Sequence, residues 1–221
     1  MREAVIVSTA RTGIGRAFRG ALNNIKSPTL MGHAIQHAVQ RAGIDPGEVE
    51  DVVIGSAMAA GTAGMNIGRL AALAAGLPQS VPGQTMDRQC ASGLMAIATA
   101  AKQIIVDGMD VTMGGGQENI SAVQNPFVKW VGEEADPLLV ARVQHAYIPM
   151  LHTAEIVAKK YGISREAQDV YSAEAQRRTA LAQERHLFDD EIVPITARMA
   201  VADKETGAVS LRDVTLSLIH I

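Results

Sequence analysis

A chain of 221 residues is long enough for one large domain, or for one domain and part of a second. Hydrophobic residues make up 48% of the chain and aromatic residues only 3%, so its core must be built from Ala, Val, Ile, Leu and Met. A net charge of -3 gives no reason to expect nucleic acid or an anionic membrane as a partner.

The single cysteine excludes an intrachain disulfide and fits a reducing compartment. The apolar run that follows Met1 is too short and wrongly flanked for a signal peptide, and no run approaches the length needed to span a bilayer. We therefore expect a soluble cytoplasmic protein.

Strands are predicted to alternate with helices through the first half of the chain. Apolar runs rich in β-branched residues predict buried strands at 4–7, 52–55 and 110–113, with a further strand ending at Cys90. Helical patterns lie between them, from Pro28 to Gly43 with Ser27 as N-cap, at 66–76, and from Leu94 to Gly108. This alternation predicts a mostly parallel sheet covered by helices on both faces.

Two further features of this half are a strongly apolar helix and a run of glycines. The helix from Leu94 is apolar almost all round, so we expect it to be buried on nearly every side. The run Gly114–Gly116 resembles a phosphate loop, but it lacks the lysine and the helix start that such a loop needs, and a tight turn is the preferred interpretation.

His33 and His37 are four residues apart on one predicted helix, a spacing that can bind a metal ion. No acidic ligand or third histidine is near them in the sequence, and exposed helix histidines are common. We therefore predict no metal site.

Cys90 lies where a predicted strand gives way to a predicted helix. The first turn of a helix presents unpaired N–H groups and a partial positive charge, which favour a thiolate over a thiol. A thiolate attacks carbonyl groups, and the small residues Ala91, Ser92 and Gly93 would let a substrate approach it. A lone cysteine is also a common small core residue, so the residues alone leave both interpretations open.

The pattern changes after Asn119. Prolines and an acidic run predict an irregular insertion up to Pro149, followed by helices at 153–161 and from Ser164, as N-cap, to about residue 186. Basic and acidic side chains are mixed along these helices without a basic stripe, which is typical of solvated helix faces.

Several motifs resemble the thiolases and occur in that family's order. The nucleophile segment is Asp87–Leu94 (DRQCASGL), and the acetyl-CoA acetyltransferase branch is the most similar. The other matching segments are Ser8–Thr12, Gly114–Asn119, Met150–Glu155, Ile163–Asp169 and Glu191–Pro194.

The resemblance implies a thiolase-like α/β fold: the N-terminal half of a layered αβαβα architecture plus the start of an α-rich loop domain. Residues 1–118 would form the N-terminal half-domain and residues 119–215 a truncated loop domain that holds coenzyme A, with the C-terminal half-domain absent. The tail 216–221 resembles a translated sequencing adapter and is expected to be non-native; the alternative is an ordinary apolar strand end.

The resemblance also implies an activity. Two acetyl-CoA molecules would condense reversibly to acetoacetyl-CoA and CoA, or a 3-ketoacyl-CoA would be cleaved, through an acyl group on Cys90. Met150 aligns with a methionine that lines the acyl pocket, although a methionine there also suits flexible core packing. Coenzyme A would be a substrate, with no further cofactor, and the complete protein would be a homotetramer or homodimer.

The chain departs from the family pattern in ways that bear on activity. The Gly-His-Pro motif, whose histidine activates the nucleophile, and the second catalytic cysteine are both missing, so the chain alone is expected to be inactive. Gly64-Met65-Asn66 replaces the usual Gly-Gln-Asn, which weakens the assignment to a branch. The alternatives are a 3-ketoacyl-CoA thiolase of fatty-acid β-oxidation, a ketoacyl synthase-like condensing enzyme, and a non-catalytic lipid carrier.

Overall fold

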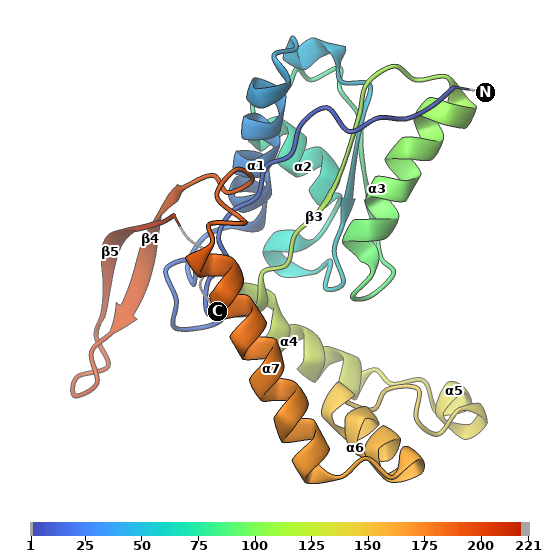
Figure 1. Cartoon of the computed structure of the whole chain (residues 1–221), viewed down its shortest axis with the longest axis vertical. Coiled ribbons are helices and arrows are strands. Elements are labelled where there is room, and N and C mark those ends of the chain that lie inside the picture. Colours follow the sequence, from blue (N-terminus) through green and yellow to red (C-terminus); the bar gives the residue numbers. More distant parts are fainter. Residues whose placement is uncertain (1, 218–221) are drawn as a thin grey trace. The chain divides into compact units, whose positions relative to one another are not determined.

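The computed structural model describes residues 2–217, which form two compact units (Figure 1). Within the described residues, the first unit comprises 2–127 and 191–217, and the second comprises 128–190. The domain limits predicted at 118/119 and 215/216 follow the division of the resembling family and stay a prediction.

The first unit is built on a parallel three-stranded sheet in the order β2-β1-β3. Every residue of the central strand β1 (Asp51–Gly55) is buried, as its Val-Val-Ile run predicts. The flanking strands are β2 (Gly83–Met86) and β3 (Thr112–Gly116). The predicted parallel arrangement is thereby confirmed.

Helices cover both faces of this sheet, with α1 and α2 on one face and α3 on the other (Figure 1). Side chains of a strand alternate between faces, so Val52 and Ile54 pack with α1 and α2, whereas Val53 packs against Ala96 and Ala100 of α3. The helices are α1 (Ser27–Ala42), α2 (Ile67–Ala74) and α3 (Ser92–Lys102).

The predicted helices are present, and several of their ends are shifted by one to three residues. Ser27 is the first residue of α1 and not its N-cap, which is Lys26; α1 ends before Gly43, whose φ of 68° suits glycine. The side chain of Asn66 caps α2 by accepting a hydrogen bond from the amide of Arg69. Two short 3-10 helices, η1 (Pro46–Glu48) and η2 (Gly61–Ala63), lie in the connections.

The predicted strand at residues 4–7 is wrong. This segment has no strand assignment, and the exposed fractions of Val5, Ile6 and Val7 are 73%, 78% and 73%. A guanidinium hydrogen bond from Arg2 to the carbonyl of Gly108, 2.8 Å long, holds its start. An apolar run favours a strand only where a partner strand completes the hydrogen bonds, and sequence alone does not supply that partner.

The glycines at 114–116 do not form the predicted tight turn. They are the last three residues of β3, because α3 lies directly against this strand. A Cβ on Gly114 would lie 2.6 Å from the Cα of Ile97, and one on Gly116 would lie 2.9 Å from the Cα of Gly93. Glycine is needed here for close packing of backbone on backbone.

The outer side of α3 is open in this chain. The helix continues as a π-helix, η3 (Gln103–Asp107), and its outer side chains include Leu94, 73% exposed, and Val106, 75% exposed. The expectation that it is buried on nearly every side is therefore wrong here. Within the described residues, the stretch Gln89–Asp107 is also long and apolar enough to cross a bilayer by length and composition alone, which corrects the expectation that no run approaches that length.

The second unit is helical, and the expectation of an irregular insertion is wrong. The strongest missed signal is Asp136-Pro137, because the Asp136 carboxylate caps the next helix by accepting from the amides of Leu138 and Leu139. Ser164 caps the long last helix, as predicted. The helices are α4 (Ile120–Glu133), which begins in the first unit, α5 (Pro137–Arg142), α6 (Met150–Tyr161) and α7 (Arg165–Glu184).

The chain returns to the first unit with an antiparallel hairpin that the sequence analysis did not predict. Its strands are β4 (Ile195–Ala202) and β5 (Val209–Leu216). The Asn23 side chain both donates to and accepts from the backbone of Ala200, which ties the hairpin to the loop that precedes α1. Leu216, where the suspected non-native tail begins, is the last residue of β5, and residues 218–221 of that tail lie outside the described residues.

Candidate functional site

Cys90 lies in a short turn between β2 and α3, and it is exposed. The Asp87 carboxylate accepts a hydrogen bond from the amide of Gln89 at 2.7 Å, and Gln89 adopts a left-handed backbone with φ of 49°. The chain thus reverses direction just before the sulfur, and the turn presents Cys90 two residues before the start of α3. The unpaired N–H groups of the first turn of α3 therefore follow directly after the sulfur-bearing residue.

The hydroxyl of Ser92 closes this turn from inside. It accepts a hydrogen bond from the amide of Arg88 at 2.8 Å and donates one to the carbonyl of Gln89 at 2.6 Å. The residue is only 3% exposed, so water cannot easily replace either partner. Ser92 therefore ties the backbone just before Cys90 to the first residue of α3.

The start of α3 lies directly on the carboxyl ends of the sheet. A Cβ on Gly55, the last residue of β1, would lie 2.2 Å from the carbonyl carbon of Ser92. Ligand sites in parallel α/β sheets lie at the carboxyl ends of the strands, and Cys90 follows one of those ends.

A polar cluster joins the same strand ends behind the turn. The Glu118 carboxylate accepts from the hydroxyl of Ser56 at 3.3 Å and from the amide of Ala57 at 2.8 Å. Ser56 also accepts from the side-chain amide of Gln117 at 3.2 Å. The sequence analysis missed this cluster; the available signal was a serine directly after β1 and a glutamate two residues after β3.

The two paired histidines make a local contact. Their rings meet edge to face with centroids 4.5 Å apart, and the Nε2 atom of His33 lies 2.9 Å from the carbonyl oxygen of Pro194. Burial, followed by the nearby His37, lowers the pKa of His33, while the bond to Pro194 opposes that shift. Within residues 2–217, no group of three or more His, Cys, Asp or Glu side chains could hold a metal ion.

Met150, the residue predicted to line the acyl pocket, begins α6 in the second unit and is 72% exposed. Cys90 belongs to the first unit. The role of Met150 therefore stays a prediction.

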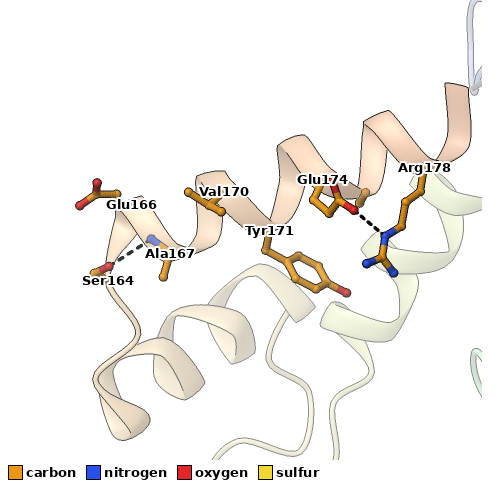
Figure 2. Close-up of a pocket in the computed structure, with 8 residues that line it drawn as sticks. Ser164, Glu166, Ala167, Val170, Tyr171, Glu174 and Arg178 are labelled. Carbon is orange, nitrogen blue, oxygen red and sulfur yellow. Dashed lines mark hydrogen bonds and ion pairs between the residues drawn. The ribbon is translucent and has the colours of Figure 1, made fainter. Parts of the chain in front are cut away.

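The second unit has a hollow of about 680 Å³ along one side of α7 (Figure 2). Glu174 on this side accepts hydrogen bonds from Arg177 and Arg178, which lower the pKa of its carboxyl to about 2. No residue predicted to be functional borders the hollow. Its lining residues are Ser164, Glu166, Ala167, Val170, Tyr171, Glu174, Ala175 and Arg178.

Residues 4–213 match the family described as "Thiolase, N-terminal domain". The chain belongs to the thiolase family. It is 40% identical over 195 residues to a 3-ketoacyl-CoA thiolase of Bacillus subtilis, an alignment that covers 88% of this chain and 49% of the relative. It is also 40% identical over 204 residues to an acetyl-CoA acetyltransferase of Cupriavidus necator, with 88% of this chain and 51% of the relative covered.

A solved structure gives the same result for the fold. The crystal structure of the Bacillus anthracis acetyl-CoA acetyltransferase superposes with a TM-score of 0.76 at 33% identity, covering 96% of this chain and 54% of that one. The predicted family and the predicted thiolase-like α/β fold are both confirmed. This thiolase-family chain spans about half the length of the relatives that it matches.

Proposed function

We propose that this thiolase-family chain supplies the nucleophile of an acyltransferase. The Cys90 thiolate attacks the thioester carbonyl of an acyl-CoA, a new carbon–sulfur bond forms, and the CoA thiolate leaves with its electron pair. The observation that carries the proposal is the placement of the only cysteine, exposed, in a braced turn between β2 and α3. Dividing the transfer into acylation and deacylation replaces one difficult step by two easier ones.

The backbone after Cys90 supports the first step. Attack on the thioester creates a tetrahedral intermediate with an oxyanion, which needs N–H donors held in place before the reaction begins. The first turn of α3 begins at Ser92, and its backbone is held against Gly55. Donors of this kind each contribute about 3 kcal/mol to stabilising such a transition state.

The proposed substrates are acetyl-CoA and 3-ketoacyl-CoA. They are supported by the names of the relatives, acetyl-CoA acetyltransferase and 3-ketoacyl-CoA thiolase. In condensation, a second acetyl-CoA loses a proton from C2, its carbanion attacks the acetyl group on Cys90, and the carbon–sulfur bond breaks to return the Cys90 thiolate. In cleavage, Cys90 attacks the 3-keto carbonyl of the 3-ketoacyl-CoA, the bond between C2 and C3 breaks, and the departing acetyl-CoA carbanion takes up a proton. The thiolate of free CoA then takes the acyl group from Cys90. Both directions share the acyl-cysteine.

The complete activity needs groups outside these 221 residues. The histidine and second cysteine that the family resemblance implies are absent from this sequence. We therefore expect the chain alone to be acylated slowly at most and to show no turnover. A homo-oligomeric complete protein in the cytoplasm stays a prediction.

The test uses the chain alone and the chain joined after residue 213 to the C-terminal half of the Cupriavidus necator relative. Each is incubated with acetyl-CoA labelled in its acetyl group, and the label is mapped by peptide mass spectrometry. We expect label on Cys90 in the joined protein and none after Cys90→Ser. Label elsewhere, or label that survives the substitution, would contradict the proposal, and acylation only by an acyl-carrier thioester would support a ketoacyl synthase.

A further inference from the structure

The three strand ends around Cys90 are joined by hydrogen bonds that converge on Ser56. Its amide donates to the carbonyl of Met86, the last residue of β2, at 3.1 Å. Its hydroxyl donates to Glu118, which follows β3. Ser56 therefore bonds both to the end of β2, which leads into the turn that holds Cys90, and to the segment after β3.

The hydrogen bonds of this cluster have a fixed direction. The Ser56 hydroxyl has one proton and accepts from the side-chain amide of Gln117, so its own proton must go to Glu118. The second oxygen of the Glu118 carboxylate accepts from the amide of Ala57. Position 118 therefore receives two donors, and only a carboxylate has an oxygen for each of them.

The cluster contacts the nucleophile turn through closely packed backbone. Gly55, next to Ser56, touches Ser92, and Gly116, two residues before Glu118, touches Gly93. Ser56 is 1% exposed, so the joint lies in a close-packed interior that transmits small displacements. A shift of the segments after β1 or β3 would consequently move the start of α3 relative to the sulfur.

We propose that Glu118 is a positioning residue for Cys90 that acts through Ser56. This inference rests on the proposed function, because it assigns Glu118 to the orientation of the same nucleophile. The Glu118 carboxylate accepts hydrogen bonds from Ser56 and Ala57, which directly follow β1. These bonds hold the first turn of α3 in the geometry that activates the thiol. The carboxylate itself takes no part in bond making.

The test measures how the fold activates the thiol. The rate constant for alkylation of Cys90 by iodoacetamide is measured at neutral pH in the folded chain and again in urea. We call the folded rate constant divided by the unfolded rate constant the activation of the thiol. We expect the activation to exceed one in the unaltered chain and to fall about three- to tenfold in Glu118→Gln, which loses one hydrogen bond to a charged group. Ser56→Ala should cause a similar fall, and the double variant should fall no further.

Glu191→Gln is the matched control. It makes the same chemical change in the same unit, where Glu191 pairs with Arg11 at 3.2 Å and lies outside the cluster. Far-UV circular dichroism and the urea midpoint of each variant show whether it is folded. The control should lose some stability and keep the full activation, whereas a merely structural role for Glu118 would make the two variants behave alike.

The outcomes separate this inference from the proposed function. An unaltered chain whose folded thiol reacts no faster than its unfolded thiol would overturn the proposed function. An activated thiol that is unaffected by Glu118→Gln, or equally affected by Glu191→Gln, would overturn the role of Glu118. Additive effects of Ser56→Ala and Glu118→Gln would show that Glu118 does not act through Ser56. If Glu118→Gln does not fold, Ser56→Ala is the test, and an unchanged activation in that variant would overturn the inference.

Discussion

Adding one methyl group at Gly55 should separate the nucleophile helix from the sheet. In Gly55→Ala the new Cβ would lie 2.2 Å from the carbonyl carbon of Ser92, 2.3 Å from its oxygen and 2.6 Å from the amide nitrogen of Gly93. All three atoms belong to the backbone, and ordinary contacts begin near 3.4 Å. The start of α3 must therefore move by about 1 Å, because no side chain can rotate away.

The expected cost follows from this displacement. Overpacking a core costs about 1–3 kcal/mol, and three backbone clashes place this substitution at about 3 kcal/mol. Each kcal/mol lowers the melting temperature of a protein of this size by about 2–4 °C, so we expect a fall of about 6–12 °C. Thermal and urea unfolding followed by far-UV circular dichroism measure this, and Cys90 alkylation reports whether the turn has moved.

Gly132→Ala is the control, because no atom lies within 4 Å of the added methyl group and its backbone is not left-handed. Alanine should leave the stability unchanged there or raise it by up to about 1 kcal/mol, since it favours helix. A melting temperature of Gly55→Ala within about 2 °C of that of the unaltered chain would mean a loss of less than about 1 kcal/mol. That result would refute the close packing of α3 on β1.

Three further predictions concern other parts of the structure. Ser92→Ala leaves the amide of Arg88 and the carbonyl of Gln89 without their partner, so we expect a loss of about 1–3 kcal/mol and faster amide exchange at 88–92, with unchanged exchange contradicting the role of the hydroxyl. The lowered pKa of His33 means that the unfolded chain binds this proton more readily, so stability should fall as the pH drops below about 6.5. His33→Gln should flatten that slope in urea unfolding measured at several pH values, and an equally steep slope in the variant would contradict the role of His33. Because Leu94 of α3 and Val106 of η3 are exposed apolar side chains, we expect the chain to self-associate through this surface, and Leu94→Gln with Val106→Gln should raise the soluble monomer fraction in size-exclusion chromatography. An unchanged monomer fraction would contradict this.

The sequence predicted best those elements whose signals are local. The Val-Val-Ile run of β1, the Ser164 cap of α7 and the end of α6 at Tyr161 each involve residues within a few positions of one another. Hydrogen bonds and burial over such short spans follow from residue type. The junction between strand and helix at Cys90 was predicted, but the strand was expected to reach Cys90 and β2 ends at Met86, because Asp87 and Ser92 brace a turn in between.

The failures involve partners that are distant in sequence. Residues 4–7 have the composition of a buried strand but make no strand pairing, and the outer side of α3 has the composition of a core surface but stays open. The glycines of β3 were misinterpreted because their function is to admit α3, which precedes them in the chain. Glu118 escaped notice because its two donors are more than 60 residues earlier.

The left-handed backbone of Gln89 restricts which residues can precede the sulfur. At a φ of 49° a β-branched side chain collides with its own backbone, whereas glycine and asparagine fit with little strain. A library randomised at this codon and selected for folded protein should accordingly retain Gly, Asn and Asp and lose Val, Ile and Pro. The residues accepted at position 89 would then report the backbone conformation beside Cys90 without any measurement of enzymatic activity.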